Sequence, residues 1–314
     1  MKTVLSTRML VLSISTALCI PAFACITLFS FASCTADKDI IAKDAQVEKL
    51  ADGFSFTEGP ASDTGGNVYF TDQPNNRIHK YSVNGKLSVF MEDAGRSNGL
   101  YFDHQGNLLA CADMENELWS IAPDGSHTVL ITDFESNKFN GPNDLWIHPN
   151  GKIYFTDPLY ARDYWNRTLE MQQQGEYVYC FNPQTSITTC VATDLKKPNG
   201  IIGTPDGKRL YVADIGDGKT YSYEIAPDGS LTNRQLAAPM GSDGMTMDEC
   251  GNIYLTGKGV TVFNPRGEQI AHIPVDASWT ANVTFGGEDG KTLFITASEG
   301  LYAIRMNVKG SERE

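Results

Sequence analysis

Six side chains that carry an acceptor oxygen recur along the sequence, each eight residues before a glycine that opens a short β-rich run. They are Glu58, Asn98, Asn143, Asn199, Asp243 and Asn282. Calcium binds about 6–8 oxygen atoms from carboxylates, amides and water. The two carboxylates match the charge of a divalent cation, and the amide oxygens would complete its coordination without excess negative charge. If the six positions meet at one point, they predict a metal site, with Ca2+ as the first candidate and Mg2+, Mn2+ or Zn2+ as alternatives.

Each of these residues also has a simpler interpretation. Asn and Asp before a strand commonly cap turns through hydrogen bonds to their own backbone. The recurrence of the six positions in one phase favours a shared polar site over separate turns. Asp72, Asp157 and Asp214 stand at the ends of expected strands, and we interpret them as turn caps without a catalytic role.

A sequence repeat supplies the elements that would position the six side chains. Its glycines are spaced 40, 45, 56, 44 and 39 residues apart and are Gly66, Gly106, Gly151, Gly207, Gly251 and Gly290. A period of about 40–45 residues with several short strands per unit is typical of a propeller blade. The sequence therefore predicts an all-β, six-bladed β-propeller over residues 47–310, in which residues 47–56 add a strand to the last blade and close the ring. If the strand after each of the six positions is innermost, their side chains converge on the axis.

The longest interval between repeat glycines carries an insertion. It runs from Pro158 to Gly175 and is rich in Tyr, Arg and Gln. We interpret it as a rim loop or a lid over the predicted site.

The N-terminus resembles an export signal. Lys2 and Arg8 precede an uncharged stretch that ends before Cys34. Small residues before Cys34 favour a lipoprotein leader over residues 1–34, followed by a polar tether over residues 35–46, although cleavage before Cys25 and an uncleaved anchor remain alternatives. All three interpretations place the functional domain outside the cytoplasm. We expect an exported bacterial protein that is periplasmic or, with a lipidated Cys34, an outer-membrane lipoprotein.

Charge and cysteine content narrow the possible partners. The formal net charge is −13, and an acidic body argues against a nucleic-acid partner. Cys180 and Cys190 flank a turn-like segment and are expected on one hairpin. An oxidising compartment would permit a disulfide between them, but two reduced thiols are an open alternative.

Several fragments together resemble the gluconolactonase / senescence marker protein / luciferin-regenerating enzyme family. They are Thr57-Glu58-Gly59-Pro60, Gly141-Pro142-Asn143-Asp144, Tyr154-Phe155-Thr156-Asp157-Pro158, Pro198-Asn199-Gly200 and Ser242-Asp243-Gly244-Met245, and the resemblance covers about residues 50–308. It implies a six-bladed propeller that hydrolyses lactones with a divalent metal in its central channel. By motif, Glu58, Asn199 and Asp243 match metal ligands, and Asn143 matches a position that binds metal or substrate. Asp243 also matches the proposed general base.

One position departs from the pattern of that family. Sugar-lactonase members often carry an arginine two residues before the asparagine that Asn143 matches, and that arginine grips sugar hydroxyls. Here the position is Gly141, so a gluconolactone-like substrate is in doubt. Arg96 is a candidate substitute from the neighbouring blade, and Asn98, Asn143 and Asn282 are the other candidate substrate contacts.

The resemblance and the predicted ring together favour a metal-dependent lactonase. The metal would polarise the lactone carbonyl, while Asp243, or as second choice Asp144, would accept a proton from the attacking water. The alternatives are a binding module with a structural metal and a phosphotriester hydrolase that uses the same ring. Gly95-Arg96-Ser97-Asn98-Gly99 reads as a nucleophile motif, but it precedes a strand where a helix is required, and all histidines lie outside the ring phase.

Overall fold

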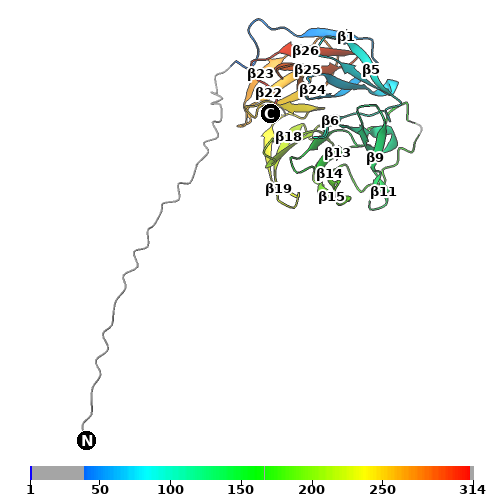
Figure 1. Ribbon diagram of the computed structural model, residues 1–314, viewed down its shortest axis with the longest axis vertical. Coiled ribbons are helices and arrows are strands. Elements are labelled where there is room, and N and C mark those ends of the chain that lie inside the picture. Colours follow the sequence, from blue (N-terminus) through cyan, green and yellow to red (C-terminus); the bar gives the residue numbers. More distant parts are fainter. Residues whose placement is uncertain (2–38, 166, 312–314) are drawn as a thin grey trace. The chain divides into compact units, whose positions relative to one another are not determined.

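The computed structural model describes Met1 and residues 39–165 and 167–311. Within these residues the chain forms six four-stranded antiparallel sheets, one two-stranded hairpin and two single-turn 3-10 helices. The sheets are the blades of a β-propeller, which confirms the predicted fold (Figure 1). Among the described residues, no helix is long and apolar enough to span a bilayer.

Each blade is written here from its innermost strand outward. The first three blades are β2 (Thr57–Ser62), β3 (Val68–Asp72), β4 (Arg77–Tyr81) and β5 (Leu87–Glu92); β6 (Leu100–Phe102), β7 (Leu108–Ala112), β8 (Glu117–Ile121) and β9 (His127–Ile131); and β12 (Leu145–Ile147), β13 (Ile153–Asp157), β14 (Tyr177–Asn182) and β15 (Ile187–Ala192). The last three are β16 (Pro198–Gly203), β17 (Arg209–Asp214), β18 (Lys219–Ile225) and β19 (Leu231–Ala238); β20 (Met245–Met247), β21 (Ile253–Gly257), β22 (Gly259–Phe263) and β23 (Gln269–Ile273); and β24 (Thr280–Gly286), β25 (Thr292–Ala297), β26 (Gly300–Arg305) and β1 (Glu48–Asp52). The hairpin is β10 (Asp133–Phe134) with β11 (Asn137–Lys138), and the 3-10 helices are η1 (Gln73–Asn75) and η2 (Asp113–Glu115).

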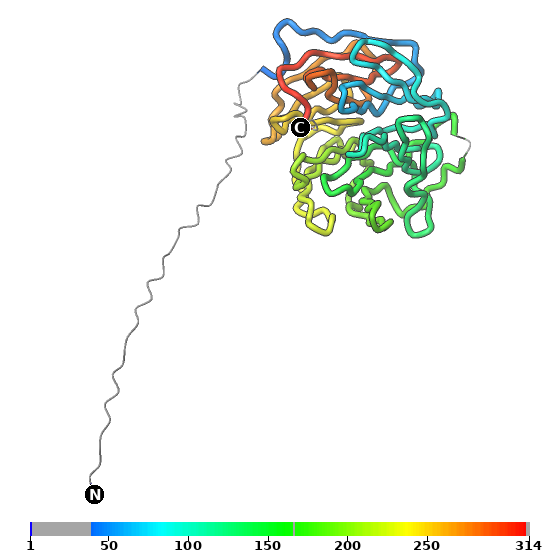
Figure 2. Tube along the Cα trace, in the orientation of Figure 1, coloured from blue at the N-terminus to red at the C-terminus, as the bar shows by residue number. Residues whose placement is uncertain are grey.

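The ring closes as predicted, because β1 pairs antiparallel with β26 as the outermost strand of the sixth blade. Figure 2 shows this blue N-terminal strand beside the red C-terminal strand. Residues just before β1 also join the folded unit: Ile40 is buried, and Ile41 bridges to Met306. Part of the segment expected to be a tether therefore packs on the sixth blade. The predicted leader, with Cys25 and Cys34, lies outside the described residues.

Burial falls from the inner to the outer strand of a blade. All five residues of β3 are buried, whereas only one of the six in β5 is. The hydrophobic core lies between neighbouring blades, as where Trp146 of the third blade packs against β16 of the fourth. A methyl group at Gly203 would lie 2.3 Å from the Trp146 ring, so the absent side chain lets the two blades approach.

Two repeated polar residues on the second strand of a blade hold the segment that leads into its innermost strand. The Asp72 carboxylate accepts hydrogen bonds from the backbone of Ser55 and Phe56. Asp157 does the same for Asn140 and Gly141, and Asp214 for Lys196 and Lys197. The threonine before two of these aspartates links blades, since Thr71 donates to the carbonyl of Asn98 and Thr156 to that of Asn199. The turn-cap interpretation agrees with these contacts, and the caps also fix the backbone near the predicted site.

Cys180 and Cys190 lie on adjacent strands of one hairpin, β14 and β15, as expected. In the antiparallel register Cys180 faces Thr189, while Cys190 faces Tyr179. Successive residues on a strand point to opposite faces of the sheet, so the two thiols are on opposite faces. Both are free in the structure.

Candidate functional site

The structure brings the six predicted positions, hereafter the ring residues, together around the channel. Each stands at or just before the start of an innermost strand. Four of the six ring residues are each followed by a glycine, and that glycine lies against the ring residue of the next blade. A Cβ atom at Gly59 would lie 2.0 Å from the Asn98 carbonyl oxygen, and one at Gly244 would lie 1.9 Å from Cγ of Asn282. The glycine after the oxygen-bearing residue therefore lets neighbouring blades approach closely at the ring.

Glu58 and Asp243 place two carboxylates in this ring. Burial raises the pKa of Glu58 well above its usual range, and the charge of Asp243 raises it further. Burial likewise raises the pKa of Asp243, although a hydrogen bond from Trp279 and the positive charge of Arg162 oppose the shift. Like charges in a low-dielectric site repel, so the pair favours either a shared proton or a bound cation.

Asp243 is fixed by hydrogen bonds to both of its oxygens. Asn199 Nδ2 donates to Oδ1 at 2.8 Å, and the indole Nε1 of Trp279 donates to Oδ2 at 2.6 Å. Asn199 Nδ2 also donates to the Tyr160 hydroxyl at 2.9 Å, which leaves its amide oxygen for another partner. Two of the predicted metal ligands are thus in direct contact, and their orientation is set by aromatic side chains.

The other three ring residues are buried amides. Nδ2 of Asn98 is buried without a hydrogen-bond partner, and Asn282 Nδ2 lies 3.4 Å from Oδ2 of Asp144. Burial raises the pKa of Asp144 to about 8. The backbone carbonyl of Asn143 accepts a hydrogen bond from Gly99 at 2.7 Å. Asp144 therefore lies against the ring, as a second-choice base should, and a ligand that satisfies Asn98 would gain a buried hydrogen bond.

The predicted insertion joins β13 to β14 on the face where the innermost strands begin. Its Tyr160 accepts the hydrogen bond from Asn199, and its Arg162 lies close enough to oppose the raised pKa of both Glu58 and Asp243. The segment is therefore a lid over the ring, and we use this name for residues 158–165 and 167–175. Sequence reasoning found the lid but assigned no role to Tyr160, Arg162 or Trp279. The richness in Tyr and Arg was the only signal.

Arg96, the proposed substitute for the missing arginine, is held by the rim. Its guanidinium donates to the carbonyl of Pro74 and stacks on Tyr164 of the lid at 4.4 Å from the ring centroid. It therefore supports the lid. The space beside Gly141 is filled, since a Cβ atom there would lie 2.2 Å from Oδ1 of Asp113.

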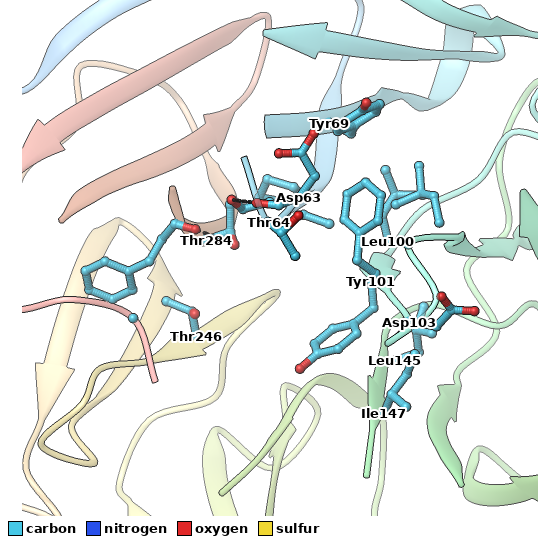
Figure 3. Close-up of a pocket in the computed structure, with 18 of the residues that line it drawn as sticks. Asp63, Thr64, Tyr69, Leu100, Tyr101, Asp103, Leu145, Ile147, Thr246 and Thr284 are labelled. Carbon is cyan, nitrogen blue, oxygen red and sulfur yellow. Dashed lines mark hydrogen bonds between the residues drawn. The ribbon is translucent and has the colours of Figure 1, made fainter. Parts of the chain in front are cut away.

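A cavity of about 510 Å³ opens at the other end of the channel (Figure 3). Its labelled residues, such as Asp63, Tyr101 and Thr246, follow the starts of the innermost strands and lie toward the turns beyond them. Asp144 and Asn282 line it as well, so it reaches the ring from the side opposite the lid. Ser97 of the Gly95–Gly99 motif is buried, and its hydroxyl donates to the Ala94 carbonyl. This agrees with the interpretation that the motif is not a nucleophile elbow.

The ring suits a divalent cation by its chemistry. Two carboxylates, Glu58 and Asp243, share one buried site with amides that turn an oxygen inward on rotation about their last side-chain bond. A cation between the carboxylates would remove the repulsion that raises the pKa of Glu58. In the described part of the chain no three His, Cys, Asp or Glu side chains cluster as metal ligands.

Comparisons with known proteins agree with the propeller fold and show the family. The gluconolactonase of Zymomonas mobilis is 25% identical over 293 residues, which cover 84% of this chain and 82% of that protein. The diisopropyl-fluorophosphatase of Loligo vulgaris is 27% identical over 282 residues, covering 80% and 88% of the two chains. The solved structure of a gluconolactonase from Xanthomonas campestris superposes with a TM-score of 0.80 at 27% identity and covers 85% of this chain and 91% of its own. Residues 56–299 match the family described as the SMP-30/Gluconolactonase/LRE-like region, and the chain belongs to this family.

Proposed function

We propose that the protein is a metal-dependent hydrolase that opens lactones at the ring under the lid. The observation that carries the proposal is the buried pair Glu58 and Asp243, bordered by amides and covered by a lid that bears a cation. Membership of the family and similarity to two gluconolactonases support this class of substrate.

The metal would be held by Glu58, Asn143, Asn199 and Asp243, with Ca2+ as the first candidate. A divalent cation supplies Lewis-acid polarisation of the lactone carbonyl and stabilises the negative charge that develops on its oxygen. Its affinity should depend on Glu58 and Asp243 being ionised, because protonated carboxyl groups are poor ligands.

Asp243 is the proposed general base. It would accept a proton from water as the water oxygen attacks the carbonyl carbon of the lactone. It would then return that proton to the leaving oxygen of the lactone as the ester bond breaks. The hydrogen bonds from Trp279 and Asn199 hold the carboxylate in one orientation and leave lone pairs on both oxygens. Asn98 and Asn282 are the proposed substrate contacts, because both are ring residues with amide side chains.

A panel of sugar lactones and simple aliphatic lactones tests the proposal, with acid release followed by pH-stat. We expect hydrolysis that a chelator abolishes and that one of Ca2+, Mg2+, Mn2+ or Zn2+ restores. Hydrolysis that is insensitive to the chelator would contradict metal dependence, and failure on every lactone would contradict the substrate class.

One relative favours a second candidate function. The diisopropyl-fluorophosphatase matches most of this chain, so the same panel should include a fluorophosphate and a phosphotriester. Turnover of these without turnover of lactones would assign the ring to phosphorus chemistry. If neither class reacts with any of the four metals, a binding module with a structural metal becomes the better account.

We also propose that the protein is exported and acylated at Cys34. The proposal depends on the small residues before Cys34 and the polar run after it. Mass spectrometry of the membrane fraction should find a diacylated or triacylated N-terminal Cys34. An unmodified mature chain that begins at Cys25 would contradict the tether.

A further inference from the structure

The lid carries two arginines whose hydrogen-bonding groups are satisfied unequally. Nη2 of Arg167 donates to the Asn140 carbonyl at 2.7 Å, and its guanidinium stacks 3.6 Å from the centroid of Trp165. Arg162 stacks less closely on Tyr160, at 5.1 Å, and its Nε lies 3.9 Å from Oδ2 of Asp113. That distance is too long for a hydrogen bond. Nε is buried without a partner in both arginines, but among the described residues Arg167 donates hydrogen bonds through Nη2, whereas the guanidinium of Arg162 makes none.

Arg162 is also the lid arginine whose charge acts on the two carboxylates of the ring. Its charge acts on Glu58 and Asp243 as well as on Asp113, whereas Arg167 acts on Asp113 and Asp157. Its neighbour Tyr160 contacts Asn199 directly, so the two side chains face the ring from the same part of the lid. The Arg162 side chain is 25% exposed, and its buried Nε–H has no partner among the described residues. A guanidinium of this kind beside a candidate site is suited to an oxygen-bearing ligand.

The lid also explains why position 141 holds a glycine. A Cβ atom there would lie 2.2 Å from Oδ1 of Asp113 and 3.0 Å from Nη2 of Arg167. Any side chain at this position would disturb the contact between Asp113 and Arg167, which anchors the lid to the second blade. An arginine at position 141 has no room, but the lid carries Arg162 near the ring.

We propose that Arg162 is a substrate-binding residue, which donates hydrogen bonds from the lid to an oxygen of a polyhydroxylated lactone or of its acid product. Asp113 and Tyr160 position it, and Arg167 fixes the lid. The choice of ligand depends on the lactonase function proposed above, whereas the binding role of Arg162 is tested without turnover.

The experiment is calorimetric titration of the calcium-loaded full chain with D-gluconate and, separately, with sorbitol. We expect Arg162→Gln to weaken binding of gluconate roughly ten- to hundredfold, the range for a lost hydrogen bond from a charged group. A matched loss for sorbitol would show that the guanidinium binds hydroxyls, and a loss for gluconate alone would show that it binds the carboxylate. Arg305→Gln, an exposed arginine on β26, is the matched control and should bind both probes as the wild type does.

Arg162→Lys and thermal unfolding separate binding from a structural role. Lysine retains the charge but cannot donate from Nε, so we expect intermediate affinity at an unchanged unfolding temperature and calcium affinity. Wild-type affinity for both probes in Arg162→Gln would overturn the proposal, as would a wild type that binds neither probe. A wild type that hydrolyses no lactone would instead contradict the proposed function, and the pH-stat panel measures that activity independently.

Discussion

The ring and the lid lie against each other but are held in different ways. The ring residues are placed by recurring features of the blades, which are a carboxylate or threonine on the second strand and, after four of the six, a glycine that admits the neighbouring blade. The lid occurs once and is held by contacts that no other blade has, such as those of Arg167 with Asp113 and Asn140. The difference indicates that the repeated fold positions the ring residues, whereas the proposed binding of substrate by Arg162 would depend on one insertion.

Asp243→Asn should have the largest effect, because it removes charge and basicity from the ring while keeping shape and one ligand oxygen. We expect turnover of any accepted lactone to fall roughly 10²–10⁴-fold, the usual loss for a general base. Metal affinity should weaken as well. The measurement is single-turnover kinetics at saturating metal.

A wild-type rate in Asp243→Asn after refilling with metal would place the base elsewhere. Asp144 would then be the leading candidate, because its carboxylate contacts Asn282 of the ring.

Gly244→Ala tests whether the close approach of the blades positions the ring. The new methyl group would overlap Asn282 and should cost about 1–3 kcal/mol of unfolding free energy, with weaker metal binding. Gly65→Ala is the control, because its nearest neighbours are the ends of the Asn67 and Asp63 side chains at 3.3 Å. Denaturant unfolding measures both, and equal stability of the two variants would contradict a tightly packed ring.

Asn98→Ala separates substrate binding from metal binding within the ring. The amide has a buried, unpaired Nδ2, so its removal should not destabilise the protein. We expect KM to rise about tenfold with kcat and metal affinity nearly unchanged, as for a lost uniform binding contact. Asn143→Ala is the comparison variant and should lose metal affinity. If Asn98→Ala also loses metal, the division of roles between these two asparagines is wrong.

The smallest expected effect concerns the anchor of the lid. Burial raises the pKa of Asp113 to about 7, against the opposing charges of Arg162 and Arg167. The folded protein therefore holds a proton that the unfolded chain releases near its ordinary pKa. The resulting stability is present at low pH and is lost as the pH rises through about 7.

Asp113→Asn should therefore flatten this dependence. The unfolding temperature of the metal-free wild type should fall by a few degrees more between pH 5 and pH 8 than that of the variant, which retains an acceptor for Gln73. Identical slopes in the two proteins would show that Asp113 does not titrate in this range.

The contrast between ring and lid also marks what the sequence can predict. The blades, the closing strand and the six ring positions follow from a repeat, because equivalent positions in a closed ring must meet at its axis. The glycines after Glu58 and Asp243 were visible too, although only the structure shows that they admit the next blade. The role of Arg162 was not predictable, since it depends on how a unique segment packs on Asp113, far away in the sequence. The contacts of Arg96 were not predictable for the same reason, because its orientation is set by Pro74 and Tyr164.

Anomalous diffraction from crystals soaked in Mn2+ tests the central claim most directly, because it locates the metal without reference to activity. We predict a single strong peak inside the ring, with oxygen atoms of Glu58, Asn143, Asn199 and Asp243 at about 2.0–2.6 Å. The amide of Asn199 should then present its oxygen in place of the nitrogen that now contacts Asp243. An empty ring, or an ion held by other side chains such as those of the cavity opposite the lid, would contradict the account.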